Sequence, residues 1–152
     1  MSGAGAALQG GRFNRPGVPA LYLSVEPETA LAEYRQGSSI VQPATLAAFI
    51  ADFSVVADLS AGHDTAHWAP AWVDWDCDWR WIARVEKRTP LSWLLGDEVI
   101  RAGCAGLLFP STQHRGGTNL VVFDSNLTGT DSLAVHDPDG RLPTDARSWP
   151  ST

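Results

Sequence analysis

Short strand-like segments lie toward both ends of this sequence, and helical patterns occupy much of the region between them. The segments ALYLS (20–24), AGLLFP (105–110) and LVVF (120–123) are apolar or alternating, and turn-forming residues lie beside them. This order lacks the regular strand–helix alternation of a doubly wound parallel sheet. We therefore predict an α+β fold with a compact mixed or antiparallel β core and flanking helices.

Three segments are predicted to be helical. In VEPETALAEYRQG (25–37), Pro27 suits the first helical position and Gly37 is a natural stop. WDCDWRWIARVEKR (75–88) has tryptophan and aliphatic residues at three-to-four spacing, which predicts one helix. TPLSWLLGDEVIRAG (89–103) predicts a further helix or helix pair, stopped by its last glycine. TLAAFIADF (45–53) stays ambiguous, because its apolar residues begin at helical spacing and end in an extended pattern.

Length and charge favour a single-domain protein and argue against nucleic-acid binding. A chain of 152 residues is expected to form one domain, here divided into a flexible N-terminus (1–9) and a single domain (10–152). The formal net charge of −6 argues against a nucleic-acid-binding protein, which needs a basic surface. The sequence has no apolar run of 18 residues and no signal-peptide pattern, so we expect a cytoplasmic protein without a membrane span.

The stretch GGRFNRPGVPALYLSVEPETALAE (10–33) contains three candidate site residues. Arg12 lies in a glycine-bearing loop, where its guanidinium could bind a phosphate or ribose oxygen, or could be an ordinary surface arginine. Tyr22 lies mid-strand and either faces a cleft or is a half-buried sheet residue. Glu33 lies near the apolar side of a short helix, as a candidate for electrostatic catalysis or as a solvated surface residue.

Other polar residues are weaker candidates. Ser111 ends an apolar strand and either lines a site or caps a turn, and it lacks the GxSxG context of a nucleophile elbow. His63 and His67 are four residues apart, but they do not form HExxH and no third ligand is evident, so no metal is expected. Cys77 and Cys104 are isolated and are read as unpaired, buried thiols.

Five segments in order resemble motifs of the RES domain family, which is named for an arginine, a glutamate and a serine. They are GGRFNRPGVPALYLS, TALAE, CDWRWI, AGLLFPS with GGTNLVVF, and DPDGRLP. The resemblance covers most of the chain, from about Gly10 to Leu142, and by analogy makes TLAAFIADF a strand. Two departures are Phe13, where tryptophan is commoner, and a short segment before Gly10, from which an N-terminal strand is expected to be missing.

The resemblance implies a fold related to the diphtheria-toxin type of ADP-ribosyltransferase, with NAD+ as co-substrate and no metal. It implies that Glu33 stabilises the oxocarbenium-like centre formed when the nicotinamide–ribose bond breaks. Arg12 would bind the diphosphate or ribose, and Tyr22 would hold the nicotinamide ring. Ser111 would donate a hydrogen bond to ribose or nicotinamide without acting as nucleophile. The second-rank NAD-binding positions are Asn14 and Asn119.

Members of this family are commonly toxins of bacterial toxin–antitoxin pairs. The resemblance implies transfer of ADP-ribose to a host protein such as phosphoribosyl-pyrophosphate synthetase. Two alternatives stay open: an NAD+ phosphorylase or glycohydrolase that depletes NAD+, and a catalytically silent partner-binding protein. The implied partner is an Xre-like helix-turn-helix antitoxin that blocks the pocket near Arg12 and Glu33 and makes any DNA contact itself.

Overall fold

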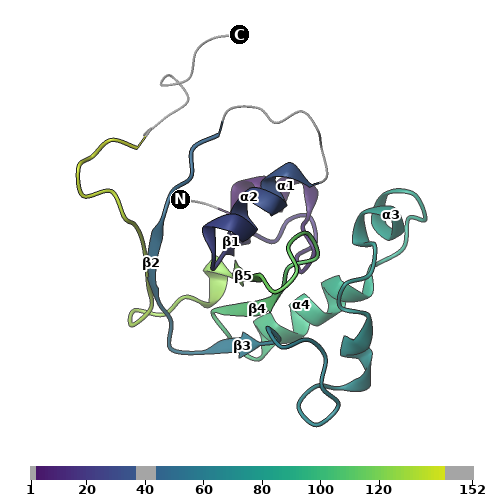
Figure 1. Cartoon of the computed structure of the whole chain (residues 1–152). Coiled ribbons are helices and arrows are strands. Elements are labelled where there is room, and N and C mark those ends of the chain that lie inside the picture. Colours follow the sequence, from purple (N-terminus) through teal and green to yellow (C-terminus); the bar gives the residue numbers. More distant parts are fainter. Residues whose placement is uncertain (1–2, 37–43, 143–152) are drawn as a thin grey trace.

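The computed structural model describes residues 3–36 and 44–142 and combines two β-sheets with short helices (Figure 1). The helices are α1 (Ala4–Gln9), α2 (Pro27–Arg35), α3 (Trp79–Arg84) and α4 (Leu91–Arg101), with 3-10 turns η1 (Pro70–Asp74) and η2 (Asp124–Asn126). The strands are β1 (Leu21–Ser24), β2 (Phe49–Asp52), β3 (Val56–Asp58), β4 (Gly106–Pro110), β5 (Thr118–Val122) and β6 (Ser132–Val135). The predicted α+β class is confirmed, while the relation to diphtheria-toxin-type folds stays a prediction.

The main sheet has four strands in the order β1-β5-β4-β3. β5 pairs antiparallel with both β1 and β4, whereas β3 pairs parallel with β4. Asn119 on β5 lies opposite Ser24 on one side and Phe109 on the other. Residues directly opposite one another in a sheet point to the same face, and alternation adds Tyr22 to that face. The sheet therefore brings Tyr22, Ser24, Phe109 and Asn119 together.

The second sheet pairs β2 with β6 in antiparallel register and lies on the opposite side of the molecule from α3 (Figure 1). The strand expected in residues 45–53 by family analogy is present, but only from Phe49 to Asp52. Gly37, which the sequence predicts as the stop of the helix that begins at Pro27, lies outside the described residues. So do residues 39–43, which precede the ambiguous segment 45–53.

The hydrophobic core lies where the main sheet, α4 and η1 meet. Phe13 and Phe109 stack edge to face with ring centroids 4.9 Å apart, and Trp72 and Trp75 are buried beside them. Gly96 on α4 lies directly against the Phe13 backbone, where a Cβ atom would overlap the carbonyl oxygen. The absence of a side chain at Gly96 thus lets α4 support the loop that carries Arg12.

The flexible terminus predicted for residues 1–9 stays a prediction, and within that segment the structure places helix α1. Its Ala6 carbonyl accepts a hydrogen bond from Asn14 Nδ2 at 3.0 Å, and its Ala7 carbonyl accepts one from the Gly17 amide at 2.7 Å. A six-residue helix is marginal in isolation, so these tertiary bonds help to explain its formation. The assignment of residues 10–152 to a single domain stays a prediction.

The single helix predicted over residues 75–88 is wrong, because α3 begins only at Trp79. In a continuous helix the Trp81 amide would donate to the Cys77 carbonyl. Here that amide donates to Asp78 Oδ1, which caps the helix, and the Cys77 carbonyl accepts from Arg12 instead. The tryptophan spacing reflects burial in successive short elements, with Trp72, Trp75 and Trp79 all buried.

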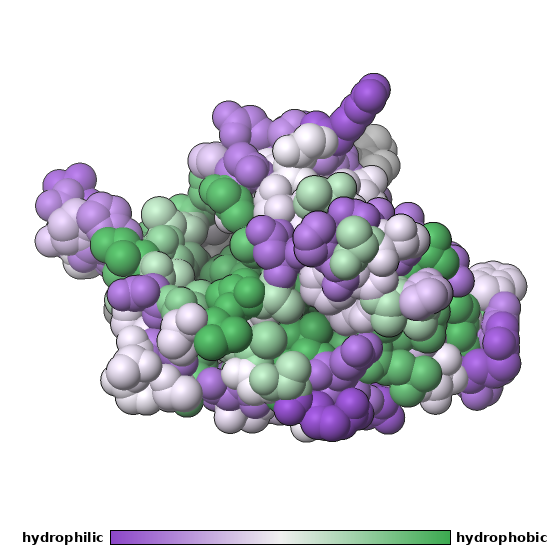
Figure 2. Space-filling model, turned by 90° about the horizontal axis from the view of Figure 1, so that it is seen from below, coloured by the Kyte–Doolittle hydropathy of each residue, from purple (hydrophilic) through white to green (hydrophobic). Residues whose placement is uncertain are grey.

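The surface seen from below carries apolar residues in several patches, which polar residues separate (Figure 2). None of the helices in the described part of the chain combines the length and the apolar character needed to cross a membrane.

Candidate functional site

A cleft of about 1210 Å³ is lined by the loop after α1, by β1 and α2, by residues 44–49, and by α3. Four residues singled out from the sequence line it: Arg12, Tyr22, Glu33 and Asn119. Its volume lies above the roughly 300–1,000 Å³ usual for ligand pockets, so it has room for a ligand as large as a dinucleotide. Side chains from distant parts of the sequence thus share one concave surface.

Glu33 is held in the cleft by two donors from other elements. Ser111 Oγ donates to Glu33 Oε1 at 2.8 Å, and Asn119 Nδ2 donates to the same oxygen at 2.6 Å. Ser24 Oγ in turn donates to Asn119 Oδ1 at 2.8 Å, which orients the amide. Within the described residues no hydrogen bond engages Glu33 Oε2. The carboxylate is therefore fixed through Oε1.

Ser111 does not itself line the cleft, but it donates a hydrogen bond to Glu33, which does. Besides donating to Glu33, its hydroxyl oxygen accepts from the backbone amides of Gln113 at 3.1 Å and His114 at 2.9 Å. The hydrogen and both lone pairs of the hydroxyl are thus engaged. This geometry gives Ser111 a positioning role toward Glu33 and is unsuited to a nucleophile. Contact between Ser111 and NAD+ stays a prediction.

Arg12 is held by its neighbours in the core. Its Nη1 donates to the Cys77 carbonyl at 3.1 Å, and the guanidinium carbon lies 5.8 Å from the Trp75 ring centroid. Burial lowers the pKa of Arg12, while the nearby groups of Cys77, Asp76 and Glu33 oppose that shift. An arginine nonetheless stays charged at neutral pH. A half-buried cation therefore lies within electrostatic reach of the Glu33 carboxylate.

Tyr22 lines the cleft with its ring and has its hydroxyl tied into the Arg12 loop. The hydroxyl donates to Asn14 Oδ1 at 2.8 Å and accepts from the Phe13 amide at 2.9 Å. Burial raises the pKa of Tyr22 above its usual value, so the phenol is neutral. Gly11 makes this arrangement possible, because a Cβ there would lie within 2.6 Å of Asn14 Oδ1.

Asn14 does not line the cleft, although the sequence suggested it as an NAD-binding position. Its side chain is buried, and Nδ2 donates to the carbonyls of Ala6 at 3.0 Å and Val18 at 2.8 Å while Oδ1 accepts from Tyr22. These bonds join α1, the loop and β1. The structure thus assigns Asn14 to the support of the Arg12 loop.

Three cleft residues on α3 were missed by sequence reasoning: Trp79, Arg80 and Arg84. The segment was interpreted as one helix packed into the core, with attention to its tryptophans. A signal was present, since Arg80 and Arg84 are four residues apart and such residues share a helix face. What the sequence did not show is that this face borders the cleft.

Groups suited to hold a metal ion are not found in the part of the chain that the structure describes. No cluster of three or more histidine, cysteine, aspartate or glutamate side chains occurs there. The chemistry available at the cleft comes from a carboxylate, guanidinium groups, an aromatic ring and amides.

Comparison with known proteins yields one match. A family model described as RES domain matches residues 1–145 of the chain. A search of the curated proteins gives no match.

Proposed function

Because the chain belongs to the RES domain family, which is associated with NAD use and toxin–antitoxin systems, we propose that it cleaves the nicotinamide–ribose bond of NAD+ and transfers ADP-ribose to a host protein. The observation that carries this proposal is the presence of Arg12, Tyr22 and Glu33 in one cleft. These residues supply a cation, a flat aromatic surface and an anion, which are the groups that binding and cleavage of NAD+ require. Their order in the chain also matches the motifs that resemble the family.

Glu33 acts on the charge that develops during cleavage. When the bond between the nicotinamide nitrogen and ribose C1′ breaks, the electron pair leaves with nicotinamide and positive charge develops at C1′. A carboxylate fixed before the reaction stabilises this charge without reorganising. Ser111 and Asn119 hold Glu33 Oε1 in place, which leaves Oε2 for the ribose. A nucleophile of the acceptor then attacks C1′ and loses its proton.

Arg12 and Tyr22 place the dinucleotide relative to Glu33. The ring of Tyr22 offers a surface for the nicotinamide, and Arg12 offers a cation for ribose or phosphate oxygens. Since the cleft has a volume of about 1210 Å³, an acceptor side chain has room beside NAD+. The same cleft also admits water or phosphate, so the acceptor is decided by the labelling experiment below.

The direct test is incubation of the protein with NAD+ labelled in the adenylate and with host-cell lysate. Transfer predicts a labelled protein band that accompanies nicotinamide release. Free ADP-ribose without a labelled band would instead identify a glycohydrolase, and ADP-ribose 1″-phosphate would identify a phosphorylase. Absence of any nicotinamide release would contradict NAD+ cleavage altogether.

The variant Glu33→Gln tests the role of the carboxylate. Gln retains an oxygen acceptor for Ser111 and Asn119 but removes the charge, so kcat for nicotinamide release should fall about 10²–10³-fold while KM changes little. Glu28→Gln removes an exposed carboxylate from the same helix and should retain full activity. A Glu33→Gln protein that releases nicotinamide at the wild-type rate would contradict this role, whereas a variant as growth-inhibitory as wild type would favour a catalytically silent binding protein.

We further propose that the partner is an Xre-like helix-turn-helix antitoxin that covers the cleft near Arg12 and Glu33. The acidic net charge of −6 supports leaving DNA contact to the partner. Addition of the co-purified antitoxin should abolish nicotinamide release at one equivalent per active site. A stable complex that still consumes NAD+ at the full rate would contradict cleft occlusion.

A further inference from the structure

Helix α3 presents two arginines at the rim of the cleft. The guanidinium carbons of Arg80 and Arg84 lie 4.7 Å and 5.9 Å from the ring centroid of Trp79, which is itself buried. Both arginines and Trp79 line the cleft, and both arginine side chains are exposed. The Trp79 indole thus lies within cation–π distance of both guanidinium groups at one wall of the site.

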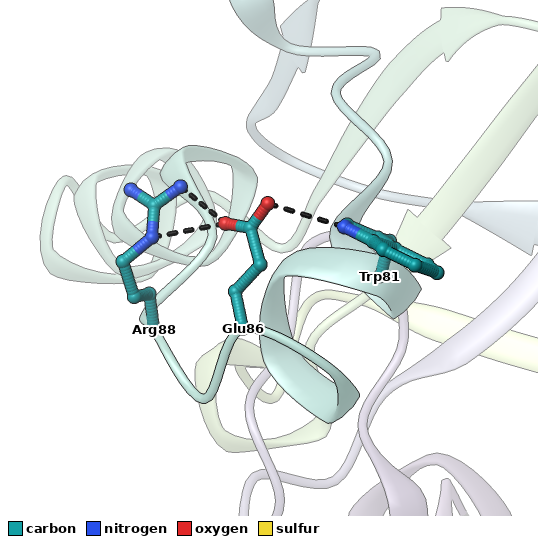
Figure 3. Close-up of polar contacts among 3 residues, drawn as sticks. All are labelled: Trp81, Glu86 and Arg88. Atoms are coloured by element: carbon teal, nitrogen blue, oxygen red, sulfur yellow. Dashed lines mark hydrogen bonds and ion pairs between the residues drawn. The ribbon is translucent and has the colours of Figure 1, made fainter.

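Within residues 3–36 and 44–142 these two charges have no carboxylate partner. Glu86 is the acidic residue that follows α3. Its carboxylate accepts hydrogen bonds from Arg88 Nε at 2.9 Å and from Trp81 Nε1 at 3.2 Å. Figure 3 shows the Glu86 carboxylate between these two groups. Asp78 caps α3 by accepting from the Trp81 amide at 3.1 Å. Among the described residues, no salt bridge reaches Arg80 or Arg84.

The position of α3 is tied to the loop that carries Arg12. The Cys77 carbonyl, two residues before α3, accepts from Arg12, and Arg84 Nη2 donates to Gln9 Oε1 at 3.4 Å. On the other side, Trp93 lies 6.4 Å from Trp79 and donates through Nε1 to the Gly11 carbonyl at 2.8 Å. Helix α3, which carries the two arginines, is therefore held at a defined place relative to Arg12.

We propose that Arg80 and Arg84 form a phosphate-binding site that takes the diphosphate of the dinucleotide. The inference rests on the proposed function, in which NAD+ is the ligand. A diphosphate carries two negative charges, and the charges of Asp76 and Glu33 already act on Arg12. Guanidinium groups without a carboxylate partner offer charge-assisted, bidentate hydrogen bonds to phosphate oxygens. In this arrangement α3 holds the diphosphate, and Arg12 is left to act at the ribose beside Glu33.

Calorimetric titration with inorganic pyrophosphate tests the phosphate site without relying on turnover. Wild type should bind pyrophosphate, and the double variant Arg80→Ala/Arg84→Ala should bind at least about tenfold more weakly. Arg88→Ala is the control, because it removes one positive charge from the neighbouring segment, where Arg88 pairs with Glu86 outside the cleft. Equal affinity in the double variant, or no binding by wild type, overturns the phosphate site.

Kinetics with NAD+ test whether the site takes the dinucleotide. In the double variant KM for NAD+ should rise at least about tenfold with kcat nearly unchanged, and Arg80→Lys/Arg84→Lys should recover part of the loss because it restores the charge. An unchanged KM overturns the assignment to the diphosphate. If wild type does not release nicotinamide from NAD+, the proposed function fails, whereas the pyrophosphate titration still decides the phosphate site.

Discussion

Single side chains in this cleft are held by bonds from other elements. Glu33 on α2 is fixed by Ser111 after β4 and Asn119 on β5, and Arg12 is fixed by the carbonyl of Cys77. In the proposed reaction, groups held in this way lose little freedom when NAD+ binds, which lowers the barrier of the chemical step. The supporting residues therefore matter through the position of Glu33 and Arg12.

The substitution Ser111→Ala tests this positioning at the residue scale. Loss of one of the two donors to Glu33 Oε1 should lower kcat for nicotinamide release about 10–100-fold and leave KM nearly unchanged. Ser125→Ala removes an exposed hydroxyl outside the cleft and should leave both constants at their wild-type values. A rise in KM without a fall in kcat would show that Ser111 instead binds the substrate directly.

Secondary structure elements place these residues through a few close approaches. Helix α4 lies against the Arg12 loop at Gly96, and α3 starts at Trp79 because Asp78 caps it. The break before α3 frees the Cys77 carbonyl for Arg12 and turns the following helix toward the cleft rim. Helix ends and glycine contacts thus determine the geometry of the site.

The substitutions Gly96→Ala and Gly5→Ala together test the close approach of α4 to the Phe13 backbone. Alanine is favoured over glycine in a helix by up to about 1 kcal/mol. Gly5 is exposed and a Cβ added there meets no neighbouring atom, so Gly5→Ala should stabilise the protein. At Gly96 the new Cβ would overlap the Phe13 carbonyl, and the free energy of unfolding should fall by about 1–3 kcal/mol. Urea denaturation measures both values, and equal effects would refute the contact.

Across the whole molecule, hydrogen bonds join segments that are far apart in the chain. Glu26, just before α2, accepts from the Thr118 amide on β5 at 2.9 Å and from Thr29 Oγ1 at 2.7 Å. The bond from the Thr118 amide, followed by that from Thr29, lowers the pKa of Glu26 below its usual value of 4.5. The ionised carboxylate thus favours the folded state as a whole.

This linkage predicts how stability depends on pH. Because the folded pKa is lowered, the contribution of Glu26 is complete above pH 4.5 and is lost as pH falls below that value. Glu26→Gln should be less stable than wild type at pH 7, and the difference in free energy of unfolding should shrink toward acid. Three other carboxylates also have lowered pKa values, namely Asp58, Asp64 and Asp131. They affect the stability of wild type and of Glu26→Gln equally, so they cancel in the difference. A difference that is constant from pH 7 to pH 3 in urea titrations would contradict this linkage.

The local elements were largely predictable from the chain. The strand at Leu21–Ser24, the helix with Pro27 at its first position and the buried strand Gly106–Pro110 all form where their patterns indicated. The prediction failed for residues 75–88, because burial of tryptophans in successive short elements imitates helical periodicity. Local patterns report burial, and they do not report which neighbour provides it.

The sequence by itself determined the α+β class, most of the elements and, through ordered motifs, the membership in a family. It also supplied Arg12, Tyr22 and Glu33 as candidates, although local pattern alone favoured the interpretation of each as an ordinary surface or sheet residue. Only the tertiary structure decided that they share a cleft, that Asn14 and Ser111 lie behind it, and that Arg80 and Arg84 border it. The physical reason is that propensity and periodicity act over a few residues, whereas the cleft depends on strand register and on contacts between residues 60 to 90 positions apart, such as Arg12 with Cys77 and Glu33 with Asn119.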